Sequence, residues 1–217
     1  MSDAEASCKK VNEWLEALPE FKNPSQVPFM NGLYFFYEDG EASSHSPDGR
    51  IVRIGNHPRK QDGLKKRLNM HYRGSKNSSV FRKFLGGAIM RQENPNNPCL
   101  LPGPGQGHWE KQDIHACEKC KPTETKVTDL LERTFRFRCL KIDDLALRNI
   151  MEEKLVATAS ICRVCKPSKD WLGKYAYAEK VRSSGLWNSN YVFEVEKRLN
   201  PYDLKKLQEL IGQTLHL

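Results

Sequence analysis

The sequence predicts an α/β (α+β) domain in which helices flank a small, mainly antiparallel sheet of three strands. Three short stretches have the composition or alternation of strands, and the segments around them carry apolar residues at helical spacing. The chain has 217 residues, of which 38% are hydrophobic and 29% charged. That is enough for one packed domain with additions, or for two small domains.

The first third of the chain predicts a helix followed by a β-hairpin. Apolar residues at helical spacing over residues 8–18 predict an opening helix, and several prolines then mark an irregular connection. Residues 32–37 are rich in aromatic side chains and predict a buried strand. A loop rich in Gly, Ser, Asp and Pro over 38–49 leads to a second strand over 50–55, antiparallel to the first if the loop closes a hairpin.

The middle of the chain predicts two helices and an insertion. The first helix covers residues 62–72, where leucines recur every four residues. The second covers 77–86, with Ser78 or Ser79 near its start and a pair of glycines at its end. Residues 91–126 are rich in Asn, Pro, Gly and His, which predicts an inserted segment with little regular structure of its own.

The last third predicts a strand and two helices. Alternation over 135–142 indicates the third strand, and Asp143 or Asp144 caps a helix that runs to about residue 160. A final helix over 201–214 has leucines on one face. We therefore expect three parts: an N-terminal helix and linker over 1–26, a central domain over 27–192, and a C-terminal helix over 193–217.

Net charge suggests the kind of partner. Lys and Arg number 35 against 27 Asp and Glu, which gives a formal charge of +8. A basic balance favours a polyanion, and nucleic acid is the first candidate. The polar N-terminus lacks the apolar core of a signal peptide, and no stretch is apolar for long enough to span a membrane. We expect a cytoplasmic protein with no membrane partner.

Five short motifs occur in an order that suggests a known family. They are Gly32-Leu33-Tyr34, Arg53-Ile54-Gly55, a basic helix with Arg67 and His71 four residues apart, a helix carrying Glu152 three residues before Leu155, and a late Trp187-Asn188. Together they resemble the GIY-YIG nuclease superfamily, with Leu for Ile in the first motif and Arg for the leading Tyr in the second. The resemblance covers roughly residues 27–192, interrupted by the insertion.

The resemblance implies a metal-dependent endonuclease that hydrolyses DNA phosphodiester bonds. Glu152 would hold Mg²⁺ or another divalent ion, because hard cations take carboxylate oxygens. Arg67 would stabilise the transition state through bidentate contact with a phosphate, and His71 lies one turn further along the same helix face.

Three residues are candidates for activating or orienting the attacking water. Tyr34 would be the general base or would orient the water, and a phenol needs a metal or cation nearby to act as a base at neutral pH. His57 and His71 titrate closer to neutrality, and the sequence does not choose between the three. Asn188 would brace the site by hydrogen bonds, although Asn190 is close enough to compete.

Arg53 is the main departure from the family pattern, since an arginine cannot accept a proton there. It could grip a phosphate instead, together with other basic residues expected to contact the DNA backbone: Lys65, Lys66, Arg73, Arg82 and Lys83. The alternative is a catalytically inactive module that only binds nucleic acid. A single active centre cuts one strand at a time. Breaking both DNA strands would need a second subunit or a second round of catalysis, so the candidate assemblies include a homodimer.

Four of the seven cysteines form two Cys-x-x-Cys pairs, Cys117 with Cys120 and Cys162 with Cys165. This spacing suits a structural zinc site, and the segment between the pairs could fold back to bring them together. Three further residues, Cys99, His108 and His115, are possible substitute ligands. The alternative is four reduced thiols without metal. A third hypothesis for the function of the chain is a zinc-organised protein-interaction adaptor.

Overall fold

The computed structural model describes residues 3–58, 62–100, 109–111 and 117–217. Its sheet has four antiparallel strands in the order β1-β4-β2-β3: β1 Glu20–Phe21, β2 Gly32–Glu38, β3 Ile51–Gly55 and β4 Phe135–Lys141. The prediction of three strands was wrong by one. The extra strand, β1, has only two residues and pairs with the edge of β4, so it is too short to show alternation.

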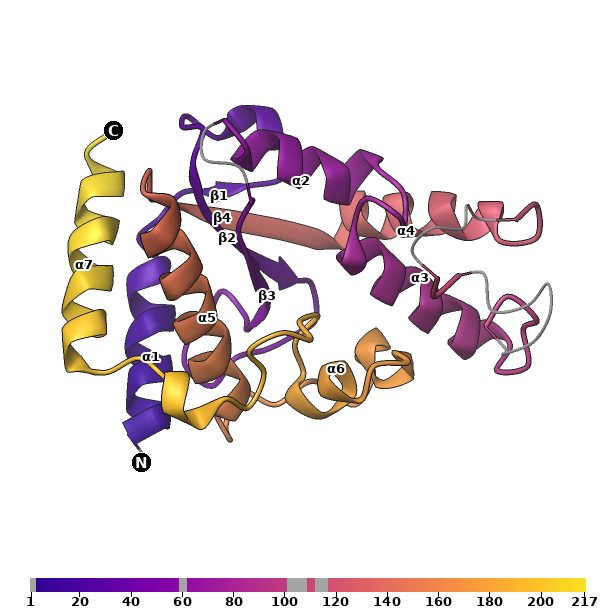
Figure 1. Ribbon diagram of the computed structural model, residues 1–217. Coiled ribbons are helices and arrows are strands. Elements are labelled where there is room, and N and C mark those ends of the chain that lie inside the picture. Colours follow the sequence, from indigo (N-terminus) through magenta and orange to yellow (C-terminus); the bar gives the residue numbers. More distant parts are fainter. Residues whose placement is uncertain (1–2, 59–61, 101–108, 112–116) are drawn as a thin grey trace.

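Helices cover both faces of the sheet (Figure 1). They are α1 Asp3–Leu15, α2 Leu64–Arg73, α3 Val80–Glu93, α4 Lys121–Thr134, α5 Leu145–Ile161, α6 Glu179–Ser184 and α7 Pro201–Leu215, with short 3₁₀ turns η1 Pro24–Gln26, η2 Leu172–Tyr175 and η3 Val195–Lys197. One layer consists of α1, α5 and α7, and the other of α2, α3 and α4 (Figure 1).

Strand β2 runs through the middle of the sheet and is buried on both faces. Tyr34 and Phe36 face the layer of α2, α3 and α4, where Phe36 packs 5.3 Å from Phe81 between ring centroids. Leu33 and Phe35 face α1, α5 and α7. A strand with two apolar faces reads as a continuous aromatic run, as residues 32–37 do.

Helix α3 is longer than the sequence suggested. Ser79 caps it by accepting a hydrogen bond from the Arg82 backbone N–H, as one of the two predicted caps. The helix then continues through Gly86 to Glu93 instead of stopping at the glycines. A methyl group on Gly86 would lie 2.0 Å from the Trp109 ring. The glycine is therefore needed for close packing within the helix, not for ending it.

The inserted segment contains part of a regular helix, which corrects the prediction for residues 91–126. Helix α4 begins at Lys121, inside the expected insertion, and runs directly into β4. Val127 and Leu131, one turn apart, are fully buried against α2 and α3. The remaining expected helices and strands lie within a few residues of their predicted bounds, and Asp144 caps α5.

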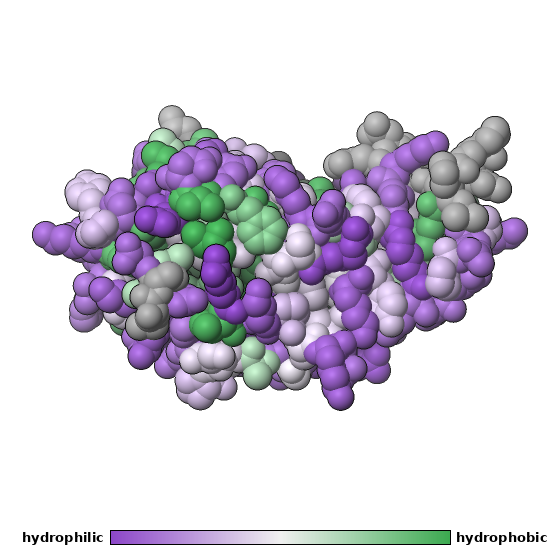
Figure 2. Space-filling view, turned by 90° about the horizontal axis from the view of Figure 1, so that it is seen from below, coloured by the Kyte–Doolittle hydropathy of each residue, from purple (hydrophilic) through white to green (hydrophobic). Residues whose placement is uncertain are grey.

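The surface is mostly hydrophilic, and hydrophobic residues form only small groups on the face seen in Figure 2. Among the described residues, no helix combines the length and the apolar character needed to cross a membrane.

Candidate active site

A cleft of about 320 Å³ opens beside β3, at the free edge of the sheet. Its wall combines side chains from β2, β3, α2, α3, α5 and the segments after β3 and before η3: Tyr34, Arg53, Asn56, Pro58, Arg67, Val80, Phe84, Glu152, Asn188, Ser189, Asn190 and Tyr191. Five of the residues predicted from sequence therefore meet in one place, although 118 positions separate Tyr34 from Glu152 in the chain.

Tyr34 begins a hydrogen-bonded chain that runs away from the cleft. Its hydroxyl lies 2.8 Å from Nε2 of His71, and the other ring nitrogen of His71 lies 2.7 Å from Oγ of Ser79. His71 is fully buried and does not line the cleft. Burial, and then the positive charges of Arg53, Arg67 and Arg82, hold the pKa of His71 well below its usual range. Its imidazole is therefore neutral at pH 7.

Arg53 faces the cleft from β3 but is only 7% exposed. Its guanidinium stacks 4.9 Å from the Phe81 ring centroid and donates to the Trp187 carbonyl. Burial lowers the pKa of Arg53, and the nearby Tyr34 and Glu152 act in the opposite direction. Its Nε is buried and has no hydrogen-bond partner among the described residues.

Arg67 approaches from α2. One guanidinium nitrogen donates to the Ser78 carbonyl at 3.0 Å, which fixes the side chain against the start of α3. Its Nε is buried and also lacks a partner within the described part of the chain. Two guanidinium groups thus line the same cleft.

Glu152 enters from α5 on the opposite layer. It is half-buried, and this burial raises the pKa of its carboxyl. Three neighbours lower the pKa of Glu152 and so oppose the effect of burial: the charge of Arg53, a backbone hydrogen bond from Asn56 and the charge of Arg67. The carboxylate therefore shares the cleft with two cations, and among the described residues it is the only acidic side chain in the lining.

Asn188 holds the edge of β3 in place. Its side-chain oxygen accepts from the Ile54 backbone N–H at 3.1 Å, and its amide nitrogen donates to the Ile54 carbonyl at 2.8 Å. The preceding Trp187 backbone N–H donates to the Val52 carbonyl at 2.7 Å. The late segment is thus bonded to β3 beside Arg53, while Asn190 lines the cleft without such bonds to β3 among the described contacts.

Comparison with protein families gives one match, to the GIY-YIG domain, over residues 8–217. The chain belongs to the GIY-YIG family. It therefore carries a nuclease domain. Comparison with curated proteins gives no match, and comparison with solved structures gives none either.

Two histidines predicted as alternatives in this GIY-YIG domain lie away from the cleft wall. His71 lies behind Tyr34, as described. His57 is 1% exposed, packs against Gly63, and lines a separate small cavity of about 80 Å³ beside Arg67. Only Tyr34 of the three water-activating candidates lines the main cleft.

The predicted basic contacts of the GIY-YIG domain differ in accessibility. Lys66 and Arg73 are exposed, although Arg73 pairs with Glu132 at 2.8 Å, and Lys65 and Lys83 are half-buried. Arg82 cannot contact DNA as predicted, because it is 1% exposed and all three of its guanidinium nitrogens bond inside the protein. Its partners are Glu124 of α4 and backbone carbonyls of α2, so it joins helices α2, α3 and α4.

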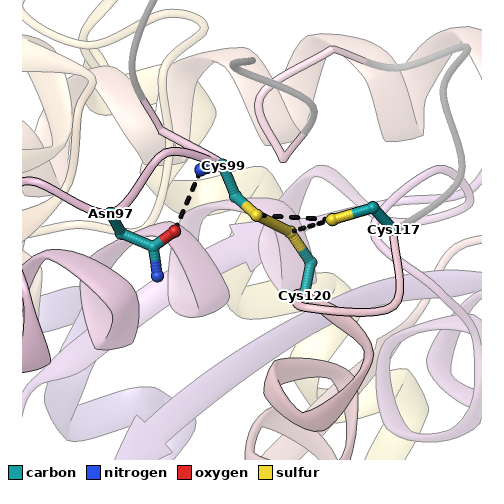
Figure 3. The surroundings of a disulfide bond; sticks show 4 residues. All are labelled: Asn97, Cys99, Cys117 and Cys120. Carbon is teal, nitrogen blue, oxygen red and sulfur yellow. Dashed lines mark hydrogen bonds between the residues drawn. A yellow bond between two sulfur atoms is a disulfide. The ribbon is translucent and has the colours of Figure 1, made fainter. Parts of the chain in front are cut away.

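The two Cys-x-x-Cys pairs do not meet, which corrects the expectation of one shared zinc site. Cys120 forms a disulfide with Cys99, and the Cys117 sulfur lies 3.2 Å and 3.4 Å from these two sulfurs (Figure 3). Cys162 and Cys165 instead gather with Cys8 and His45. Each group has ligand atoms close enough to hold a metal ion. His108 and His115 lie outside the described residues.

Sequence reasoning did not predict three contacts that shape this site. Ser79 bonds His71, Asn56 bonds Glu152 through its backbone, and Trp187 bonds Arg53 through its carbonyl. Ser79 carried a signal as a helix cap, and Trp187 as the neighbour of Asn188. The Asn56 contact uses only a backbone group, which no side-chain pattern could reveal.

Proposed function

We propose that this chain is a divalent-metal-dependent endonuclease that hydrolyses DNA phosphodiester bonds in the cleft beside β3. The observation that supports this most is the meeting of a carboxylate, two guanidinium groups and a phenol in one cleft. Phosphodiester hydrolysis needs charge stabilisation on the phosphate and an oriented water, and these groups supply both.

Glu152 is the proposed ligand of the metal. Its carboxylate and the side-chain amides of the cleft wall are oxygen donors, which suits a hard ion such as Mg²⁺ better than a soft one. A bound Mg²⁺ would supply Lewis-acid polarisation of the phosphate and relief of leaving-group charge. Burial raises the pKa of Glu152, and the two arginines oppose that shift and so favour the ionised carboxylate.

Arg67 and Arg53 are the proposed phosphate contacts. Each guanidinium lines the cleft and is already fixed by one backbone carbonyl, so little side-chain entropy is lost on binding. Arg53 takes the position of the family's second tyrosine, and a second cation there adds to the stabilisation of the developing negative charge.

Tyr34 is the proposed contact to the attacking water. It is the candidate that lines the cleft, while His71 fixes the phenol from behind. His71 is poorly suited to take up a proton, because three neighbouring guanidinium groups oppose a charged imidazole. We therefore assign His71 as a positioning residue, and Tyr34 as the group that orients the water.

Cleavage of supercoiled plasmid DNA in Mg²⁺ tests the proposal. Glu152→Gln should lose at least about 100-fold in cleavage rate, the range seen when a group that stabilises the transition state is removed. Glu153→Gln is the matched control. Glu153 is the next residue along α5, but its carboxylate pairs with Lys197 and does not line the cleft. Equal cleavage by both variants would refute the role of Glu152.

Tyr34→Phe tests the second part of the scheme. The variant should lower kcat by roughly 100-fold or more, with little change in the affinity for DNA. Salt-sensitive DNA binding by the wild type with no nicking, in Mg²⁺ or Mn²⁺, would instead identify the chain as the nucleic-acid-binding module.

A further inference from the structure

Four side chains of metal-binding types, from three distant parts of the chain, meet at the C-terminal end of α5. Cys8 lies on α1, His45 in the loop between β2 and β3, Cys162 at the end of α5, and Cys165 three residues later. Their ligand atoms all lie within 4.8 Å of one another. This group lies apart from the cleft, since none of the four residues lines it.

The spacing of these atoms matches a tetrahedral zinc ion. With Zn–S near 2.3 Å and Zn–N near 2.0–2.1 Å, two thiolates are about 3.8 Å apart and a thiolate and an imidazole nitrogen about 3.6 Å apart. The Cys8 and Cys165 sulfurs are 4.0 Å apart, and the Cys162 sulfur is 3.4 Å from Nε2 of His45. Both distances fit within a few tenths of an ångström.

The surroundings supply donors to the sulfurs. The Asn12 side-chain amide lies 3.5 Å from the Cys8 sulfur and is held there by a 2.8 Å bond to the Cys8 carbonyl. The Ser43 hydroxyl lies 3.8 Å from the Cys165 sulfur and also accepts from the His45 backbone N–H. Polar donors that orient thiolate and imidazole ligands are typical of metal sites.

We propose that Cys8, His45, Cys162 and Cys165 bind one structural Zn²⁺ ion. Three thiolates and one imidazole nitrogen complete a four-coordinate shell, which leaves no open position for catalysis. Only the Cys162–Cys165 pair is visible as a motif, and the other two ligands come from α1 and from the hairpin loop. The ion joins α1 and that loop to the helix that carries Glu152.

The other cysteine group makes a weaker case. The disulfide between Cys99 and Cys120 leaves Cys117 as the one free thiol among its three members. A disulfide sulfur is not a thiolate ligand. The cluster at the C-terminal end of α5 has three free cysteines and a histidine, and it is therefore the one that we assign to zinc.

Metal analysis of the full chain, purified without chelators, tests the site. We compare the wild type with His45→Ala, with His45→Cys, which restores a ligand, and with His216→Ala, an exposed histidine far along the chain, as the control. The zinc content should fall by one equivalent per chain in His45→Ala alone. Because the difference is measured, any ion bound at the other cysteine group does not affect the result.

Cobalt substitution gives a second measurement. Co²⁺ in the wild-type site should show the intense visible absorption of a tetrahedral thiolate complex, and His45→Cys should shift that spectrum because four sulfurs replace three. If His45→Ala does not fold, the comparison of cobalt spectra between the wild type and His45→Cys still tests whether His45 is a ligand. Zinc content unchanged in His45→Ala, no zinc in the wild type, or an identical cobalt spectrum in His45→Cys would each overturn the proposal. Loss of DNA cleavage with zinc still bound would concern the proposed function, and not this site.

Discussion

Glu38 at the end of β2 should make the protein less stable as pH rises. The carboxyl is buried and accepts hydrogen bonds from the indole N–H groups of Trp171 at 3.1 Å and Trp187 at 3.3 Å. Burial raises the pKa of Glu38 from 4.5 to about 7, although the two indoles act in the opposite direction. The folded protein therefore holds a proton that the unfolded chain releases.

The sign of the effect follows from this difference. Below about pH 4.5 Glu38 is protonated in both states and costs nothing, whereas between 4.5 and about 7 only the unfolded chain is ionised, so stability falls. At about 1.4 kcal/mol per pH unit, the loss reaches roughly 3 kcal/mol above pH 7. Glu38→Gln removes the ionisation and keeps an oxygen for the indoles, so it should recover most of that loss.

Urea unfolding at pH 5 and pH 8 measures the effect. We expect Glu38→Gln to be more stable than the wild type by roughly 2–3 kcal/mol at pH 8 and by less than about 1 kcal/mol at pH 5. Glu196→Gln, an exposed glutamate, is the control and should show no such difference between the two pH values. A Glu38→Gln variant that is no more stable than the wild type at pH 8 would refute the reasoning.

Three further substitutions test packing around the site. Gly86→Ala forces a methyl group into the Trp109 ring and should destabilise the fold by roughly 1–3 kcal/mol in thermal or urea unfolding; an unchanged midpoint would show that the ring can move away. Arg82→Met leaves the Glu124 carboxylate without its buried partner and should lower the free energy of unfolding by roughly 3–5 kcal/mol. The dependence of DNA affinity on salt concentration should stay the same, because Arg82 contacts no phosphate. A weaker salt dependence in the variant would indicate that Arg82 does contact the DNA backbone. Asn188→Ala removes both bonds to β3 and should cost roughly 2 kcal/mol or more by urea unfolding, whereas a loss under about 0.5 kcal/mol would show that the bonds to β3 contribute little.

The sequence predicted the elements whose pattern is local. Periodic leucines and alternating aromatics were enough for α2, α5, α7 and the three longer strands, and the order of five motifs was enough for the family. These signals succeed because an amphipathic helix or a buried strand records its environment in its own residues. Five of the twelve cleft residues were predicted in the same way, since each of the five stands in a short motif.

The errors arose where distant residues decide the outcome. Helix α3 passes through its glycines because Trp109, far along the chain, needs the space. Arg82 looked like a surface cation, and only the unpredicted helix α4 supplies the Glu124 that buries it. The partners of Cys162 could not be guessed either, because Cys8 and His45 stand in no motif.

The two ends of the sheet bear on how copies of this protein can associate. Open strand edges invite pairing with another chain, and natural proteins protect them. Here one border is the two-residue strand β1, and the other has the Ile54 backbone groups already bonded to an asparagine side chain, with the Val52 carbonyl taken by the Trp187 backbone. In the part of the chain that the structure describes, neither border offers a long row of unsatisfied amides, so we expect any association of two copies to use the helical layers and not to join the sheets.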